Sequence, residues 1–140
     1  MVRSRSLRAV ILASSGFALA SAAPRQEPGE GVLCLGTFLY FVEKSGARCR
    51  AGEDSEFQAG IAAYARRFDD YIIRNTGGDA TALARFKESQ NLDSEDPHFL
   101  CGGDVAGAYD HFKASPPEEL AGAVDDLLAR DGPPSFGDCV

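Results

Sequence analysis

Two histidines are the residues of this 140-residue chain best suited to acid–base or metal chemistry. His98 follows an acidic turn, and His111 directly follows Asp110. A histidine beside a carboxylate can act as a general base, and two histidines with an acidic residue can bind zinc. Their spacing matches no metal-binding motif, and sequence neighbours on a helix point in different directions. We therefore expect surface or capping roles for both histidines. A small hydrolase or metal-dependent enzyme using them and nearby carboxylates is the alternative.

A second candidate is a calcium site in the acidic turn N-L-D-S-E-D. Its carboxylates are Asp93, Glu95 and Asp96, and Ca²⁺ prefers such oxygen ligands. The turn lacks the glycine at the sixth position and the glutamate at the twelfth position of an EF-hand loop. We interpret it as a solvated acidic turn, and the sequence assigns no metal ligand.

Asp69 and Asp70 form an adjacent carboxylate pair within a stretch of helical periodicity. Asp70 lies four residues after Arg66 and four residues before Arg74. Residues at this spacing are neighbours on a helix surface, where opposite charges stabilise by a few tenths of a kcal/mol per pair. We therefore interpret the two aspartates as part of a surface charge ladder.

Motifs of common enzyme classes are missing from the sequence. It contains no G-x-S-x-G turn around a serine, no G-x-x-x-x-G-K-[ST] phosphate loop and no G-x-G-x-x-G loop. The sequence therefore predicts no catalytic residue and no cofactor-binding residue, and it favours a non-catalytic function.

Four cysteines set the covalent framework: Cys34, Cys49, Cys101 and Cys139. An even number in an exported chain indicates two disulfides. No two of them have the C-x-x-C spacing of a redox or zinc site, and no haem-attachment motif occurs. We expect structural bridges.

The pairing of the cysteines has three solutions. We favour Cys101 with Cys139, because an antiparallel pair formed by the last two helices would bring the start of one near the end of the other. Cys34 with Cys49 then follows by elimination. The rival is a crossed pairing of Cys34 with Cys101 and of Cys49 with Cys139.

The N-terminal stretch has the pattern of a secretory signal peptide. Three arginines within residues 1–8 precede an apolar run over residues 9–20 and the small residues Ala-Ser-Ala. This run is too short to cross a bilayer comfortably, so a membrane anchor is the weaker alternative. We expect cleavage after Ala22, a flexible leader over residues 23–31, and a periplasmic or secreted protein without a membrane span.

The clearest expected element is a helix over residues 54–76. Its large apolar residues recur at steps of three and four, which is helical spacing; they are Phe57, Ile61, Tyr64, Phe68, Tyr71 and Ile72. Ser55 and Gln58 have the spacing of a capping box. Gly77 and Gly78 are expected to end the helix, because glycine accepts the left-handed conformation found there.

The rest of the chain predicts further helices joined by short loops. The expected ranges are 32–44, 80–90, 104–114 and 117–130, with a turn over 98–101. Residues 32–44 also suit a buried strand, but no second strand is available to pair with one. The fold class is therefore all-α: a small disulfide-stapled bundle of about five helices with short loops, forming a single domain over residues 32–140.

Helix ends are indicated by capping residues. Asp79 is a suitable N-cap, and Asp96 followed by Pro97 reads as a cap with proline at the first helical position. Ser115 and Glu118 have the spacing of a second capping box.

The net charge of the mature chain limits which partners it can bind. Three arginines lie in the signal peptide, so the mature chain carries 11 basic against 21 acidic residues, a formal charge of −10. Such a surface repels nucleic acid and anionic membranes.

Ile73 lies off the apolar stripe, near Arg66. Either another helix covers it, or the two residues mark a binding surface.

The disulfide framework, the acidic surface and the absence of catalytic motifs favour an exported protein that acts by binding a partner protein. In size, signal and cysteine count the chain is similar to small exported bacterial helical proteins with two disulfides. They include inhibitors and the periplasmic immunity proteins of type VI secretion. A chaperone-like or stress-related structural protein is the second alternative to the enzyme already named.

Overall fold

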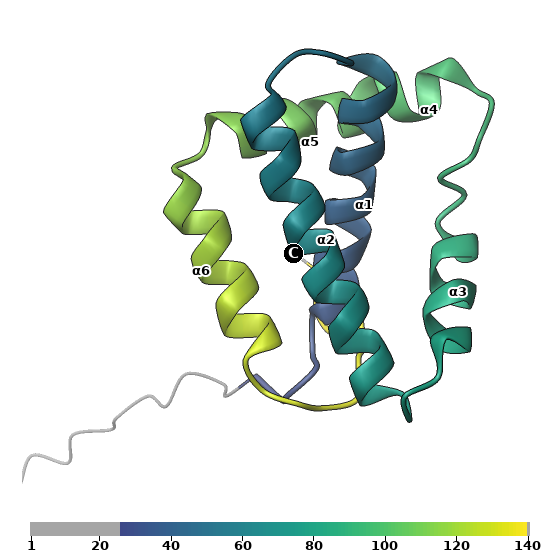
Figure 1. Cartoon of the computed structure of the whole chain (residues 1–140), viewed down its shortest axis with the longest axis vertical. Helices are drawn as coiled ribbons and strands as arrows, with labels where there is room; N and C mark the ends of the chain where they lie inside the picture. The colour runs from purple at the N-terminus through teal and green to yellow at the C-terminus, as the bar shows by residue number, and fades with distance from the viewer. Residues whose placement is uncertain (1–25, 140) are drawn as a thin grey trace, which may run out of the picture.

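The computed structural model describes residues 26–139, and this part of the chain forms six helices. They are α1 (Val32–Cys49), α2 (Ser55–Asn75), α3 (Ala80–Ser89), α4 (Pro97–Cys101), α5 (Gly103–Ala114) and α6 (Pro117–Leu128). In Figure 1, α1 and α2 lie side by side at the centre, α6 and α3 flank them, and α4 and α5 cross one end. The all-α, disulfide-stapled bundle is confirmed, with one helical turn, α4, where a turn was expected. The predicted signal peptide lies outside the described residues.

Helix α1 confirms the helical prediction but continues five residues beyond the expected end at residue 44. Ser45 and Gly46 do not end it. Ser45 is 1% exposed, and a Cβ atom on Gly46 would come within 3.0 Å of Gln58 and Tyr109. Glycine is needed here because α1 approaches its neighbours closely, and that packing offsets its weak helix propensity.

The apolar stripe of α2 forms the centre of the core, as predicted. Ile61, Phe68, Tyr71 and Ile72 are at most 2% exposed. Phe68 reaches α1 at a position where Gly36 leaves room for its ring. The burial of four large side chains on one face explains why this segment folds as an amphipathic helix.

The start of α2 differs from the predicted capping box. Asp54 is the N-cap, with a left-handed φ of 47° and no capping bond from its side chain. The side-chain amide of Gln58 donates instead to the backbone carbonyls of Arg50 and Glu53, at 3.0 and 2.8 Å. Gln58 thus holds the α1–α2 loop rather than the helix start, so the Ser55 capping box is wrong.

Of the other three predicted caps, two are confirmed and one is wrong. Asp79 accepts from the Thr81 amide at 2.9 Å, and Asp96 accepts from the His98 amide at 2.8 Å, which confirms both N-caps. The second capping box is wrong. Pro116 occupies the N-cap of α6, and the Ser115 hydroxyl donates back to the His111 carbonyl at 2.9 Å.

Asp69 belongs to an inter-helix cluster and not to a surface ladder. It accepts a hydrogen bond from the Tyr40 hydroxyl of α1 and forms an ion pair with Lys87 of α3, with an Nζ–Oδ2 distance of 2.6 Å. Burial is the largest cause of the raised pKa of Tyr40, and the hydrogen bond to Asp69 raises this pKa further. Arg74 pairs with Asp131 at 2.8 Å and not with Asp70. Asp69 therefore joins α1, α2 and α3, and the predicted ladder is wrong.

The two disulfides join Cys34 to Cys139 and Cys49 to Cys101, with Cα–Cα distances of 5.9 and 5.5 Å. The favoured pairing and the crossed rival are both wrong. Cys34 and Cys49 occupy opposite ends of α1, roughly 22 Å apart at 1.5 Å per residue, so they cannot meet. The C-terminal tail returns to the start of α1, while α4 packs at its end.

Residues 26–31, the described part of the expected flexible leader, pack against that tail. The Ser135 amide donates to the Gly29 carbonyl at 2.9 Å, and Arg130 donates to the Gln26 carbonyl at 3.2 Å. The folded unit therefore includes residues ahead of position 32. Within the described residues, no helix is both long and apolar enough to cross a membrane.

Candidate functional site

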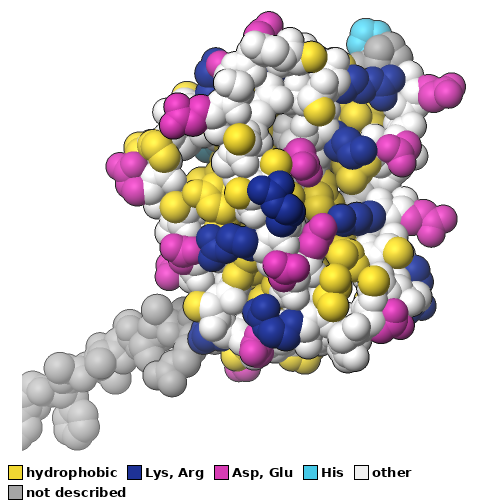
Figure 2. Space-filling model, in the orientation of Figure 1, with side chains coloured by type: hydrophobic (Ala, Val, Ile, Leu, Met, Phe, Trp, Pro, Cys, Tyr) yellow, Lys and Arg dark blue, Asp and Glu magenta, His cyan; other side chains and the backbone are white. Residues whose placement is uncertain are grey.

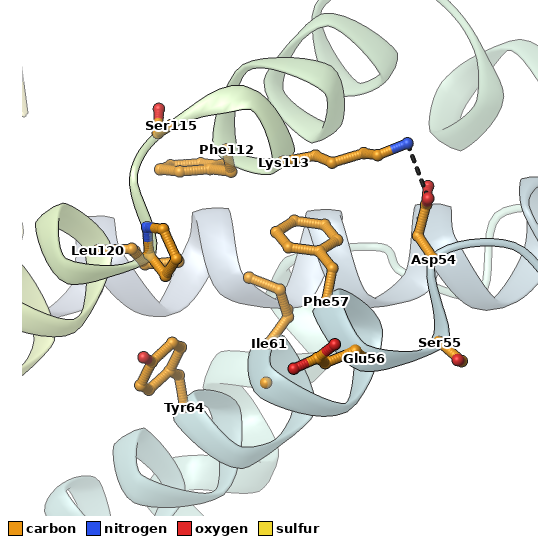
Figure 3. A pocket seen from close by; sticks show the side chains of 12 residues that line it. Asp54, Ser55, Glu56, Phe57, Ile61, Tyr64, Phe112, Lys113, Ser115 and Leu120 are labelled. Carbon is orange, nitrogen blue, oxygen red and sulfur yellow. Dashed lines mark ion pairs between the residues drawn. The ribbon is translucent and has the colours of Figure 1, made fainter.

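A groove of about 830 Å³ opens between α2, α5 and the start of α6. Its apolar lining comes from all three helices, as Figure 3 shows: Phe57, Ile61 and Tyr64 of α2, Phe112 of α5, and Pro117 and Leu120 of α6. This size and lining are typical of sites that bind a ligand or a side-chain cluster.

Helix α2 supplies one long side of the groove. Phe57, Gly60, Ile61 and Tyr64 follow the i, i+3, i+4, i+7 spacing that places residues on one helix face. Ile61 is buried, whereas Phe57 and Tyr64 are half-buried. At Gly60, apart from its chain neighbours and the adjacent backbone of α2, no heavy atom of the described residues lies within 4 Å of the place where a Cβ atom would stand. The groove is therefore open above Gly60.

One end of the groove is closed by an ion pair between Asp54 and Lys113, with an N–O distance of 2.7 Å (Figure 3). The Tyr109 hydroxyl also donates to Asp54, at 3.4 Å. The hydrogen bond from Lys113 holds the pKa of Asp54 below its ordinary value, and the same bond raises the pKa of Lys113. Both groups remain charged near neutral pH, so the pair ties α2 to the last turn of α5.

A second ion pair lies farther along α2 and joins it to α6. Arg67 follows Tyr64 on α2, Asp125 follows Leu120 on α6, and their side chains meet at 2.7 Å. Between the two ion pairs, α6 turns half-buried Leu120 toward the groove, whereas Val124 and Leu128 are buried in the core. The C-terminal half of α6 thus anchors it, and its first turns leave the groove open.

The apolar lining contacts a further exposed ring. Phe112 packs edge-on against Phe38 of α1 at a centroid distance of 6.3 Å, and Phe38 is 46% exposed. Such a large exposed apolar residue next to a groove enlarges the surface that a partner could cover.

The charges around the groove are mainly acidic. Glu56 lines it, and Glu118 and Glu119 stand in the first turn of α6; all three are exposed. None of the three makes an ion pair with another described residue. Figure 2 shows apolar side chains gathered between α2 and α6 and acidic ones along the outer edge of α6. The free charge at this site is therefore negative.

The residues singled out from the sequence lie elsewhere. His98 of α4 and His111 of α5 are both exposed, and His111 packs against the Phe112 ring at 5.8 Å. Among the described residues, no group of three or more His, Cys, Asp or Glu side chains is arranged to hold a metal. Arg66 is exposed, while Ile73 is half-buried against the core. Neither lines the groove, and a binding role for them stays a prediction.

Sequence reasoning missed the groove because its residues resemble core residues. Phe57 and Tyr64 belong to the stripe that was expected to be buried, and Phe112 and Leu120 to inner helix faces. The mid-helix Gly60 was an available signal, since a glycine inside a helix weakens it by about 1 kcal/mol relative to alanine.

Comparisons of the chain with protein families, curated proteins and solved structures found no match. The geometry of the groove therefore carries the functional argument.

Proposed function

We propose that this chain is an exported, non-catalytic protein that binds a partner protein through the groove between α2, α5 and α6. The observation that carries the proposal is the open apolar lining, contributed by three helices and bounded by two inter-helix ion pairs. Burial of apolar surface is the main favourable term in protein association, and aromatic side chains in a pocket are common anchors. An inhibitor or immunity-type protein would act in this way.

Export is part of the proposal and rests on separate support. The N-terminal sequence has the pattern of a signal peptide, and two disulfides suit an oxidising compartment such as the periplasm or the extracellular space. The disulfides join α1 to the tail that follows α6 and to α4, which precedes α5, so they would help to hold these two groove walls on the bundle outside the cell.

The test compares two variants, each of which replaces a helical glycine that has open space beside it with phenylalanine. Gly60→Phe fills the groove, whereas Gly107→Phe adds the same ring to α5 outside it. Proteins of the exported fraction of the source cells are cross-linked to each variant and quantified. The proposal expects a partner that is captured by the wild type and by Gly107→Phe and lost with Gly60→Phe. Equal capture by all three, or no specific capture by any, would contradict it.

A further inference from the structure

We infer that the occupant of the groove is a cationic amphipathic α-helix of the partner protein. This inference rests on the proposed function, since it specifies what the same groove binds. Three observations on the described residues support it: the groove's length, the helical character of its walls and the sign of its unpaired charges.

The length of the groove fits a short helix. Its lining along α2 runs from Asp54 to Tyr64, a span of roughly 15 Å at 1.5 Å per residue. A partner helix of about ten residues covers this distance in almost three turns. It would present apolar anchors at i, i+3 or i+4, and i+7, which is the recognised mode of helix-in-groove binding.

The walls favour a helix over an extended peptide. An added strand needs the exposed edge of a sheet for its backbone hydrogen bonds, and residues 26–139 form no strand. A helix satisfies its own backbone groups, so it can pack on α2, α5 and α6 through side chains alone. The rings of Phe57 and Phe112 and the side chain of Leu120 would pack against its apolar face.

The charges specify a basic helix. The two cations beside the groove are already paired, Lys113 with Asp54 and Arg67 with Asp125. Glu56 lines the groove, and Glu118 and Glu119 lie in the first turn of α6 between the lining residues Pro117 and Leu120. None of the three makes an ion pair with a described residue, so they leave negative charge beside the groove. Lysine or arginine residues flanking the apolar face of a partner helix would complement them, which increases the association rate and excludes acidic partners.

The same charge argues against a second copy of this chain as the occupant. Residues 23–140 carry 11 basic and 21 acidic side chains, so two copies repel each other. An acidic groove also disfavours the carboxylate of a fatty acid, which could otherwise occupy an apolar site.

The test measures the binding of three synthetic 18-residue peptides that carry a fluorophore. The first is a cationic helix with leucines on one face and lysines on the others. The second replaces every lysine with glutamate, and the third scrambles the cationic sequence so that the leucines share no face. The inference expects the first peptide to bind at least about tenfold more tightly than either of the others, with affinity falling as salt is raised.

Variants of the protein locate the interaction. Gly60→Phe is expected to abolish binding of the cationic peptide, and Gly107→Phe to leave it unchanged. The triple variant Glu56→Gln, Glu118→Gln, Glu119→Gln is expected to weaken binding about tenfold or more, because it removes the unpaired charges.

A control triple variant changes the net charge equally but elsewhere: Asp70→Asn, Glu88→Gln and Glu95→Gln, all exposed and without an ion pair to a described residue. It is expected to retain most of the affinity. If both triple variants weaken binding equally, the effect is one of overall charge and the inference fails.

Other outcomes also decide the question. Equal binding of the cationic and acidic helices, or tighter binding of palmitate than of any peptide, would overturn the inference. Self-association of the protein that Gly60→Phe abolishes would overturn it too. If a cross-linked partner is lost with Gly60→Phe while the cationic helix does not bind, the proposed function stands and this inference fails.

Discussion

Lys113 in the last turn of α5 and Asp54 at the N-cap of α2 form an ion pair of 2.7 Å that closes one end of the groove. The pair joins residues 59 positions apart in the sequence. Asp54 holds a left-handed backbone conformation, so its carboxylate serves the contact with α5 and not the cap of its own helix. The relative position of α2 and α5 therefore depends on a charge that acid can remove.

Asp54→Asn is expected to reduce the loss of stability in acid. Because Lys113 lowers the pKa of Asp54 in the folded state, the pair stabilises the fold above the ordinary aspartate pKa of about 3.9. That stabilisation is lost as the pH falls through the lower pKa of the folded state. Urea unfolding at pH 7 and pH 2.5 should show a difference between wild type and variant that shrinks in acid.

The control for this measurement is Asp126→Asn, at an exposed position of α6 whose side chain makes no ion pair with a described residue. It should leave the pH dependence as in the wild type. A difference between wild type and Asp54→Asn of the same size at both pH values would show that the pair is not the cause.

Two glycine-to-alanine changes are expected to have opposite effects on stability. At Gly36 a methyl group would collide with the buried ring of Phe68, so Gly36→Ala should destabilise by about 1–3 kcal/mol. At Gly60 the space is open, so Gly60→Ala should stabilise by up to about 1 kcal/mol through helix propensity. Chemical unfolding measures both. Destabilisation by Gly60→Ala would mean that the groove side of α2 is covered.

The Tyr40–Asp69–Lys87 cluster is expected to hold α3 on the bundle. Asp69→Ala leaves the buried Tyr40 hydroxyl without its acceptor and frees Lys87, so unfolding should become easier by about 1–3 kcal/mol. Hydrogen exchange should rise first in α3. The neighbouring exposed Asp70→Ala is the control and should stay within about 0.5 kcal/mol of the wild type. Equal effects of the two changes would contradict a role for the cluster.

Disulfide mapping without reduction should find the pairs Cys34 with Cys139 and Cys49 with Cys101. Trypsin separates the four cysteines into fragments 26–44, 49–50, 88–113 and 131–140. Mass spectrometry should detect the first fragment joined to the last, and 49–50 joined to 88–113. A link between 88–113 and 131–140 would support the pairing favoured by the sequence and contradict the structure.

The elements of the fold could be predicted because each one is set by local pattern. The stripe from Phe57 to Ile72 has helical spacing, and Asp79 and Asp96 supply N-cap oxygens to amides two residues away. Such signals depend on neighbours within one or two turns, so they survive without knowledge of the tertiary structure.

The predictions failed where the structure depends on contacts between segments that lie far apart in the sequence. The end of α1 depends on Gly46 packing against Gln58 and Tyr109, which overrides its propensity to break a helix. The disulfide pairing depends on how far α1 extends and where the tail runs. The groove depends on where the first turn of α6 lies relative to α2 and α5, and α2 is far from both in the sequence. Long-range geometry of this kind leaves little trace in one sequence.

The most direct test of the binding groove is to map amide chemical shifts of the protein while the cationic helical peptide is added. We expect the largest changes around Phe57, Gly60, Phe112 and Leu120, on the three helices that line the groove. Saturable changes centred instead on Arg66 and Ile73, or spread evenly over the acidic surface, would contradict this expectation.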